Sequence, residues 1–209
     1  MKRLAGVFVC LSAAACGTVV EDDSTIGTTI TSFKGAEISP RFAALTAANA
    51  PVLQIGFVRR GEGSSIRLER RDGDFEYWLS PDGAQIILQK GVLHGTRGLG
   101  EGLLAAELSE PIQHIKNLEP GFSDRFHTYL NGNDQAMTRT FRCNFEVGDA
   151  VDVEVVGGIV STRQVLENCR SLDQEFDNIY WVDPSTREIV QSRQWAGPFT
   201  GAISTRIVK

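Results

Sequence analysis

The sequence has no apolar run long enough to cross a membrane as a helix, which takes about 20 consecutive apolar residues. The N-terminal apolar segment, Leu4–Ser12, is much shorter. That segment follows the basic residues Lys2 and Arg3 and precedes the small residues Ala13–Ala15. This order is typical of an export signal with a peptidase cleavage site. We therefore predict that residues 1–15 are a signal peptide.

Cysteine is scarce, with four in 209 residues. Cys16 follows the small residues directly and precedes Gly17. This arrangement resembles the lipobox of bacterial lipoproteins, whose cysteine takes a diacylglycerol and becomes the first mature residue. Ala13 stands where the lipobox usually has leucine, and an ordinary secretory signal with an incidental cysteine is the alternative. We expect Cys16 to be the acyl anchor in the lipid bilayer, in the cell envelope at the outer membrane, facing the periplasm.

Only two cysteines remain once Cys10 leaves with the signal and Cys16 is acylated. Thiols tend to oxidise outside the cytoplasm, so we predict a disulfide between Cys143 and Cys169. Such a bridge stabilises the fold by about 3 to 4 kcal/mol on the chain-entropy model. A zinc site is the alternative, but two cysteines without a nearby histidine cluster offer too few soft ligands. No metal or other cofactor is expected.

Basic residues are outnumbered, with 21 Lys and Arg against 26 Asp and Glu. Removing residues 1–15 takes away two basic residues and no acidic one, so the net charge falls from −5 to −7. A surface with this balance is poorly suited to nucleic acid or to an anionic membrane. We therefore expect no nucleic-acid partner.

Familiar catalytic motifs are missing. The sequence has no Gly-x-Ser-x-Gly nucleophile elbow and no His-Glu-x-x-His metal motif. The glycine-rich stretch His94–Leu104 lacks both the Gly-Lys-Ser/Thr ending of a phosphate loop and the spacing of the dinucleotide fingerprint. Asp183, near Trp181, ranks first among the poor catalytic candidates. It is better explained as the start of a turn. We expect no catalytic residue.

The chain divides into a tether and a folded body. Residues 16–36 are rich in Thr, Ser, Gly and acidic residues with no sustained period, which is typical of a flexible segment. The body, residues 37–209, begins with a short helix expected over Pro40–Asn49, since Ser39 can cap it and a proline suits the first helical position. A segment starting with Ser109 as its cap is expected to add a turn or two.

The remaining chain alternates apolar and polar residues with period two. Asp-Gly, Pro-Asp-Gly and Lys-Gly turns divide residues 52–97 into a β-meander. Further strands are expected at Thr138–Phe145, Val151–Val155, Ile159–Cys169, Asn178–Val182, Glu188–Trp195 and Ile203–Ile207. Strands this numerous predict an all-β fold, either an antiparallel sandwich or a partly open barrel.

Two segments combine strands and turns in a particular order. The first runs from Tyr77 to Leu104 and contains Trp78–Ser80, Asp82-Gly83, Ile86–Gly91 and Thr96–Leu99. The second runs from Tyr180 to Lys209 and contains Tyr180-Trp181 and Ser192–Trp195. This order, with a lipobox, resembles the YjbF/GfcB family of bacterial lipoproteins, associated with capsule and exopolysaccharide production. The resemblance implies an all-β sandwich or partly open barrel, a role in polysaccharide secretion or assembly, and no established catalytic residues.

Under that resemblance the glycine-rich stretch is expected to shape a junction after a strand, with Gly98 and Gly100 at positive φ. Polysaccharides are held by stacked aromatic rings and by planar polar side chains that bridge hydroxyls. Five residues offer such contacts to a glycan or a partner: Trp78, Arg97, Trp181, Arg193 and Trp195. A role in the core is the alternative for each tryptophan.

The expected function is a non-catalytic accessory factor in exopolysaccharide or capsule production or export. Its expected partners are polysaccharide and other polysaccharide-secretion proteins. The alternatives are an envelope protein-interaction module without glycan binding and, third, a polysaccharide-modifying enzyme.

Overall fold

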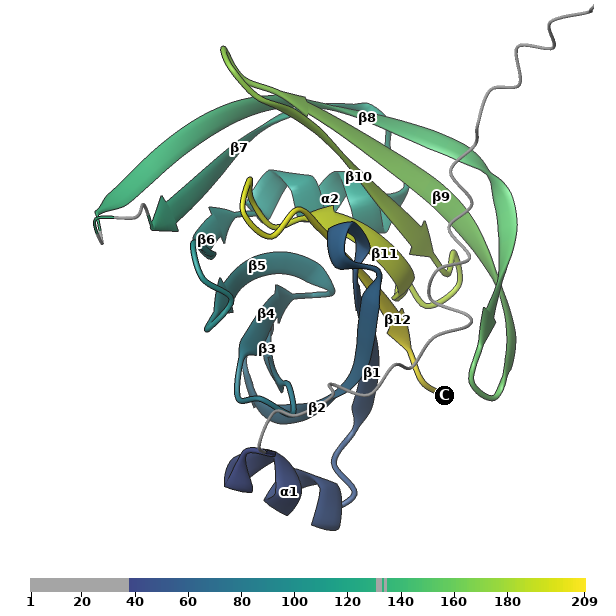
Figure 1. The fold of residues 1–209 in the computed structure, drawn as a ribbon. Coiled ribbons are helices and arrows are strands. Elements are labelled where there is room, and N and C mark those ends of the chain that lie inside the picture. Colours follow the sequence, from purple (N-terminus) through teal and green to yellow (C-terminus); the bar gives the residue numbers. More distant parts are fainter. Residues whose placement is uncertain (1–37, 131–132, 134) are drawn as a thin grey trace, which may run out of the picture.

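A single curved sheet of antiparallel strands forms the body of the protein in the computed structural model, which describes residues 38–130, 133 and 135–209 (Figure 1). The predicted signal peptide, Cys16 and the predicted tether lie outside the described residues. The strands are β1 Val52–Phe57, β2 Glu62–Asp72, β3 Phe75–Leu79, β4 Gln85–Gln89, β5 Val92–Arg97, β6 Leu103–Glu107, β7 Gly121–Leu130, β8 Ala136–Val155, β9 Gly158–Arg170, β10 Glu175–Val182, β11 Ile189–Trp195 and β12 Ala202–Ile207. Their order in the sheet is β5-β4-β3-β2-β1-β12-β11-β10-β9-β8-β7-β6.

The predicted β-meander is confirmed, because β1 to β5 pair in sequence order. Its tight connections use glycine where the backbone is left-handed, as at Gly73 with φ 56° and Gly91 with φ 88°. Residues other than glycine rarely adopt these backbone angles. The expected positive φ at Gly98 and Gly100 is also observed, at 76° and 84°.

The sheet curves until its two end strands, β5 and β6, lie against each other, giving a nearly closed barrel. Gly95 in β5 allows this approach. A Cβ built at this position would stand 2.8 Å from the carbonyl oxygen of Leu104 in β6. The barrel form among the predicted alternatives is therefore the observed one, and it depends on a residue without a side chain at the seam.

Strands β7 to β10 form a long arch over one side of the barrel (Figure 1). The two strands expected at Thr138–Phe145 and Val151–Val155 are one continuous strand, β8, with a pairing irregularity between Val147 and Ala150. The irregularity bends the strand without ending it. Strands β6 and β7 had no counterpart among the expected strands.

Two α-helices accompany the sheet in the described residues, and a 3-10 helix, Val58–Arg60, follows β1. Helix α1, Pro40–Ala47, is close to its predicted bounds and has Ser39 as N-cap, although the Ser39 side chain makes no capping hydrogen bond. Helix α2, Ser109–Asn117, is longer than the expected turn or two and lies beneath the arch (Figure 1). The prediction that Ser109 caps it is wrong. Leu108 is the N-cap, and the Glu107 carboxylate accepts a 2.9 Å hydrogen bond from the Ser109 backbone N–H.

Two apolar clusters hold the fold together. The larger fills the barrel and the space under the arch, and it includes Ile112 and Ile115 of α2. The smaller lies around Trp181 and consists of Val153, Val155, Val160, Trp181 and Val190. Because the sheet is covered on both faces here, Tyr180 and Trp181 are both buried although they point to opposite sides of β10.

Candidate functional site

A cluster of polar side chains is buried under the arch, at the centre of β7, β9 and β10. Nη1 of Arg125 donates to both carboxylate oxygens of Glu167, at 2.8 and 2.7 Å. The same carboxylate accepts from Asn178 Nδ2 at 2.7 Å and from the Tyr180 hydroxyl at 2.9 Å. All four side chains are fully buried. A buried charge pair needs such additional hydrogen bonds, since desolvation of both charges is costly.

Charge states in this cluster follow from burial and from the ion pair. Burial alone would lower the pKa of Arg125, but the Glu167 carboxylate raises it above its ordinary value, so the guanidinium stays charged. Burial, and then the neighbouring Arg125, lower the pKa of His127, which stays neutral. Nε of Arg125 donates to Nε2 of His127 at 2.7 Å, so the imidazole proton lies on Nδ1 and faces the Tyr129 hydroxyl at 2.7 Å.

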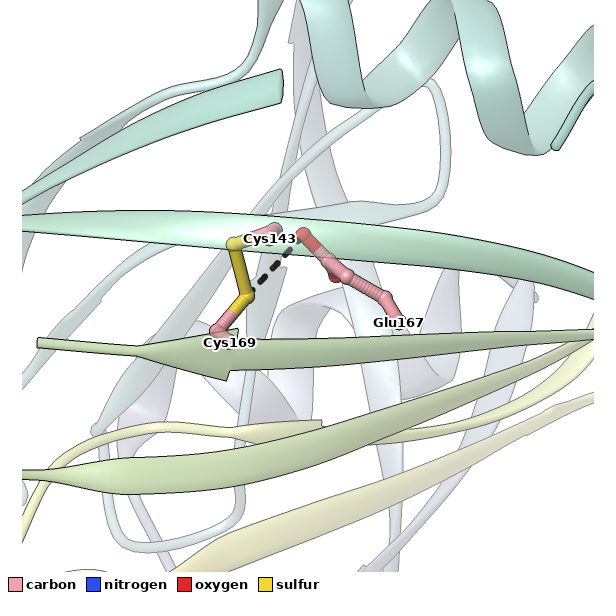
Figure 2. A group of neighbouring side chains, drawn as sticks. All are labelled: Cys143, Glu167 and Cys169. Carbon is pink, nitrogen blue, oxygen red and sulfur yellow. Dashed lines mark hydrogen bonds between the residues drawn. A yellow bond between two sulfur atoms is a disulfide. The ribbon is translucent and has the colours of Figure 1, made fainter. Parts of the chain in front are cut away.

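The predicted disulfide is present beside this cluster. Cys143 in β8 and Cys169 in β9 stand directly opposite each other, joined by a bond of 2.01 Å (Figure 2). The Sγ of Cys169 lies 3.5 Å from Oε1 of Glu167, and a disulfide sulfur has no proton to donate. The three groups are within 4.8 Å of one another. Because both sulfurs are held in the bridge, they are not thiolate ligands for a metal.

This cluster is enclosed on every side, so its chemistry is structural. Functional contact requires a surface that a ligand can reach, and the outward face of the arch supplies one. There Phe122 in β7, Asn144 in β8, Asn168 in β9 and Asp177 in β10 form one row across four strands, set by the pairing register. Sequence reasoning did not select them, since the signal becomes visible only when the strands are aligned.

We name the depression along this row the arch hollow. Its volume is about 620 Å³, and its lining is Phe122, Arg142, Asn144, Glu146, Leu166, Asn168, Arg170 and Asp177. Phe122 is 61% exposed. The guanidinium of Arg142 stands 5.5 Å from the centre of its ring.

Planar polar groups in the arch hollow are held in fixed positions by neighbours. Nδ2 of Asn168 donates to Asp177 at 2.6 Å, and Nη1 of Arg142 donates to Asp124 at 2.9 Å. Nε of Arg170 donates to Asn168 at 3.2 Å. Amides, carboxylates and guanidinium groups fixed beside an exposed ring are the groups that hold sugar hydroxyls and a pyranose face.

A second depression shares the lining residue Asp177 with the arch hollow. We name it the β11 hollow; its volume is about 320 Å³ and its lining is Val58, Arg59, Glu175, Phe176, Asp177, Arg193, Trp195, Gly201 and Ala202. The Trp195 ring stacks on Phe176 with centroids 5.9 Å apart. Nε of Arg193 is buried without a hydrogen-bond partner among the described residues. A buried donor without a partner is uncommon in folded proteins.

The structure brings two of the five predicted contact residues together. Arg193 and Trp195 both line the β11 hollow. Trp78 and Trp181, each 5% exposed, are mainly framework residues in the two apolar clusters. Arg97 is exposed at the end of β5 and lines none of the hollows described here.

Asp183 forms the predicted turn between β10 and β11. Its Oδ1 accepts hydrogen bonds from the Ser185 hydroxyl at 2.6 Å, the Ser185 N–H at 2.8 Å and the Thr186 N–H at 3.3 Å. These bonds, those from Ser185 first, lower the pKa of Asp183 to about 2. A carboxylate committed to its own turn in this way is a poor acid or base.

Comparison with known proteins places this architecture in a class of bacterial lipoproteins. The fold is shared with the crystal structure of the hypothetical lipoprotein YmcC from Escherichia coli K12, at a TM-score of 0.67 and 19% sequence identity, over 81% of this chain and 89% of that one. The chain belongs to the family described as group 4 capsule polysaccharide lipoprotein GfcB, YjbF, which matches residues 23–208. No curated protein matches the chain significantly. Of the described helices, none is long and apolar enough to span a membrane.

Proposed function

We propose that this protein is a non-catalytic accessory factor in capsule or exopolysaccharide production that holds polysaccharide on the outward face of the arch. The carrying observation is that the arch hollow, which contains Phe122, and the β11 hollow, which contains Trp195, share the lining residue Asp177. Its family membership supports the connection with capsule polysaccharide.

The proposed mechanism is binding without bond cleavage. A sugar ring stacks on the exposed face of Phe122, and Asn168 and Arg142 exchange hydrogen bonds with its hydroxyls. The next sugars continue toward Arg193 and Trp195, which line the β11 hollow. Each contact is weak, and the length of the surface lets several sugars of one chain add their contributions.

The proposed position is the cell envelope. Residues 1–15 are removed, Cys16 takes the lipid, and residues 16–36 tether the body, residues 37–209, to the outer membrane on its periplasmic side. As a flexible coil, such a tether has ends about 25 Å apart. The polysaccharide and the proteins that secrete it are then within reach of the body.

A genetic experiment tests the accessory role. The gene is deleted in its native host, surface and secreted polysaccharide are quantified, and the deletion is complemented with wild type or Cys16→Ser. We expect polysaccharide to fall after deletion and to be restored by the acylated protein alone. Unchanged polysaccharide in the deletion strain contradicts the proposed role.

A binding experiment tests the surface. The host's purified polysaccharide is titrated into the mature chain, and Phe122→Ala is compared with Phe126→Ala. Phe126 is a matched control because it is 40% exposed on the same strand and lines neither hollow. We expect Phe122→Ala alone to weaken binding, by about tenfold, since an aromatic stack contributes about 1 kcal/mol or more. A polysaccharide defect without any binding favours the protein-interaction alternative.

A further inference from the structure

The open end of the barrel holds a third hollow, which shares no lining residue with the arch hollow or the β11 hollow. We name it the mouth; its volume is about 600 Å³. The strand ends and turns around it come from β1, β2, β3, β4, β11 and β12, and helix α2 contributes Lys116. Apolar side chains on its walls are Leu53, Trp78, Leu88, Ile189 and Ile207. A volume of this size accommodates one or two sugar residues.

The rim of the mouth carries three cationic and three anionic side chains, and four of these form two ion pairs. Nζ of Lys90 is 3.0 Å from Asp74, and Nε of Arg71 is 3.0 Å from Glu76. Glu76 also accepts a 3.2 Å hydrogen bond from Nε1 of Trp78. Within each pair the two charges offset each other, so the charges of Lys116 and Glu188 remain.

Lys116 and Glu188 remain, and their surroundings differ. Nζ of Lys116 donates to the backbone carbonyl of Arg187 at 2.9 Å, and within the described chain Lys116 takes part in no ion pair. Lys116 is half-buried, whereas Glu188 is exposed. Water and salt screen an exposed carboxylate far more than a half-buried ammonium. Of these two charges, the less screened one is therefore the positive charge of Lys116.

The electrostatics of Lys116 agree with this assignment. Burial lowers the pKa of Lys116, and the neighbouring ammonium of Lys90 lowers it further. Glu188, Glu76 and Asp74 oppose this effect without cancelling it. A bound anion would stabilise the charged ammonium. Among the described residues Lys116 Nζ makes the one hydrogen bond to Arg187, which leaves two N–H groups to donate to an anion.

We propose that the mouth binds a carboxylate-bearing sugar of the uronic acid class, with the carboxylate on Lys116 and the sugar ring against the apolar wall. This inference rests on the proposed function, because it names the kind of polysaccharide unit that the protein holds. It assigns a site that is separate from the arch face. The polysaccharide would therefore contain acidic sugars.

Three matched probes separate the parts of this ligand. Methyl glucuronide has both the ring and the carboxylate, methyl glucoside has the ring alone, and acetate has the carboxylate alone. Each is titrated into the complete mature chain, made with Cys16→Ser so that it carries no lipid, and binding is followed by NMR. We expect methyl glucuronide to bind at least about tenfold more tightly than either fragment, since one charge-assisted hydrogen bond contributes that much.

Substitutions of Lys116 locate the site. Lys116→Met removes the charge while keeping the apolar stem, and Lys116→Arg keeps the charge. We expect Lys116→Met to weaken methyl glucuronide binding about tenfold and Lys116→Arg to retain most of it. Arg139→Met is the matched control, since Arg139 is paired with Asp173 away from the mouth. Thermal unfolding of each variant verifies that it is folded.

Equal binding of methyl glucoside and methyl glucuronide, or undiminished binding by Lys116→Met, overturns the inference, as does a lack of methyl glucuronide binding. These results are independent of the genetic experiment. A polysaccharide defect in the deletion strain without glucuronide binding leaves the accessory role intact and removes the mouth as a site. If methyl glucuronide binds through Lys116 but the deletion strain has no polysaccharide defect, the mouth stands as a binding site and the accessory role is contradicted.

Discussion

Apolar side chains fill both sides of the barrel interior, and the arch side adds a buried ion pair to them. The meander side, β1 to β5, is filled with apolar side chains such as Leu53, Ile66 and Ile86. Beneath the arch, β7, β9 and β10 surround the fully buried ion pair of Arg125 and Glu167. Apolar contacts are non-directional, whereas the buried pair requires each hydrogen bond in place. The meander side should therefore tolerate small changes that the arch side does not.

Removing one partner of the ion pair gives the largest expected effect. Glu167→Gln leaves the Arg125 guanidinium buried and unpaired, and we expect it to lower the free energy of unfolding by about 3 to 5 kcal/mol. Urea denaturation followed by circular dichroism measures this. The double substitution Arg125→Met and Glu167→Leu should recover a large part of the loss, since no charge is then buried. A loss below about 1 kcal/mol for Glu167→Gln contradicts the proposed role of the pair.

Removing the disulfide should have the next largest effect. The double variant Cys143→Ala and Cys169→Ala frees a loop across a sequence separation of 26 residues. We expect a loss of about 3 to 4 kcal/mol, mainly because the unfolded chain gains conformational entropy. Chemical denaturation of the variant and of oxidised wild type measures the difference. Equal midpoints and slopes for the two proteins would show that the bridge does not stabilise the arch.

On the meander side, a single missing methylene should cost less. Ile66 is fully buried in β2, and Ile66→Val keeps a branched apolar side chain there. We expect a loss of about 1 kcal/mol from transfer and packing, measured by the same denaturation. A loss as large as that of Glu167→Gln would remove the contrast between the two sides.

A pH-dependent turn gives the smallest expected effect. Hydrogen bonds from Ser185 lower the pKa of Asp183 from 3.8 to about 2. Because the folded pKa is the lower one, the carboxylate stabilises the fold above pH 4, and this contribution is lost as the pH falls from 4 to 2. Asp183→Asn should therefore destabilise the protein at pH 7 and differ less from wild type near pH 2. Thermal unfolding at both pH values measures this, and a difference that grows toward pH 2 contradicts it.

Local signals in the sequence were sufficient for the meander and for the disulfide. Asp-Gly and Lys-Gly pairs mark tight turns by their own backbone preferences, and two cysteines left in an exported chain have each other as partners. The same local reasoning divided β8 into two expected strands, Thr138–Phe145 and Val151–Val155. In the sheet, pairing with β9 on both sides of the irregularity carries the strand through.

For the candidate site residues too, local sequence signals were sufficient for some and not for others. Aromatic and arginine side chains were selected by type, and type alone did not distinguish Trp181, which a second apolar cluster buries, from Trp195, which lines a hollow. Phe122 and Lys116 were not selected, because the roles proposed for them depend on neighbours far away in the chain. Phe122 depends on the register of four strands, and Lys116 depends on the position of α2 at the end of the barrel.

By itself, the sequence determined the all-β class, the turns of the meander and the cysteine pair, since each follows from short-range periodicity, backbone preference or composition. Tertiary structure decided the closure of the barrel at Gly95, the burial of Arg125 with Glu167 and the surfaces left open to a ligand. These features depend on pairing register and on contacts between distant residues, and no local pattern in the chain encodes them separately.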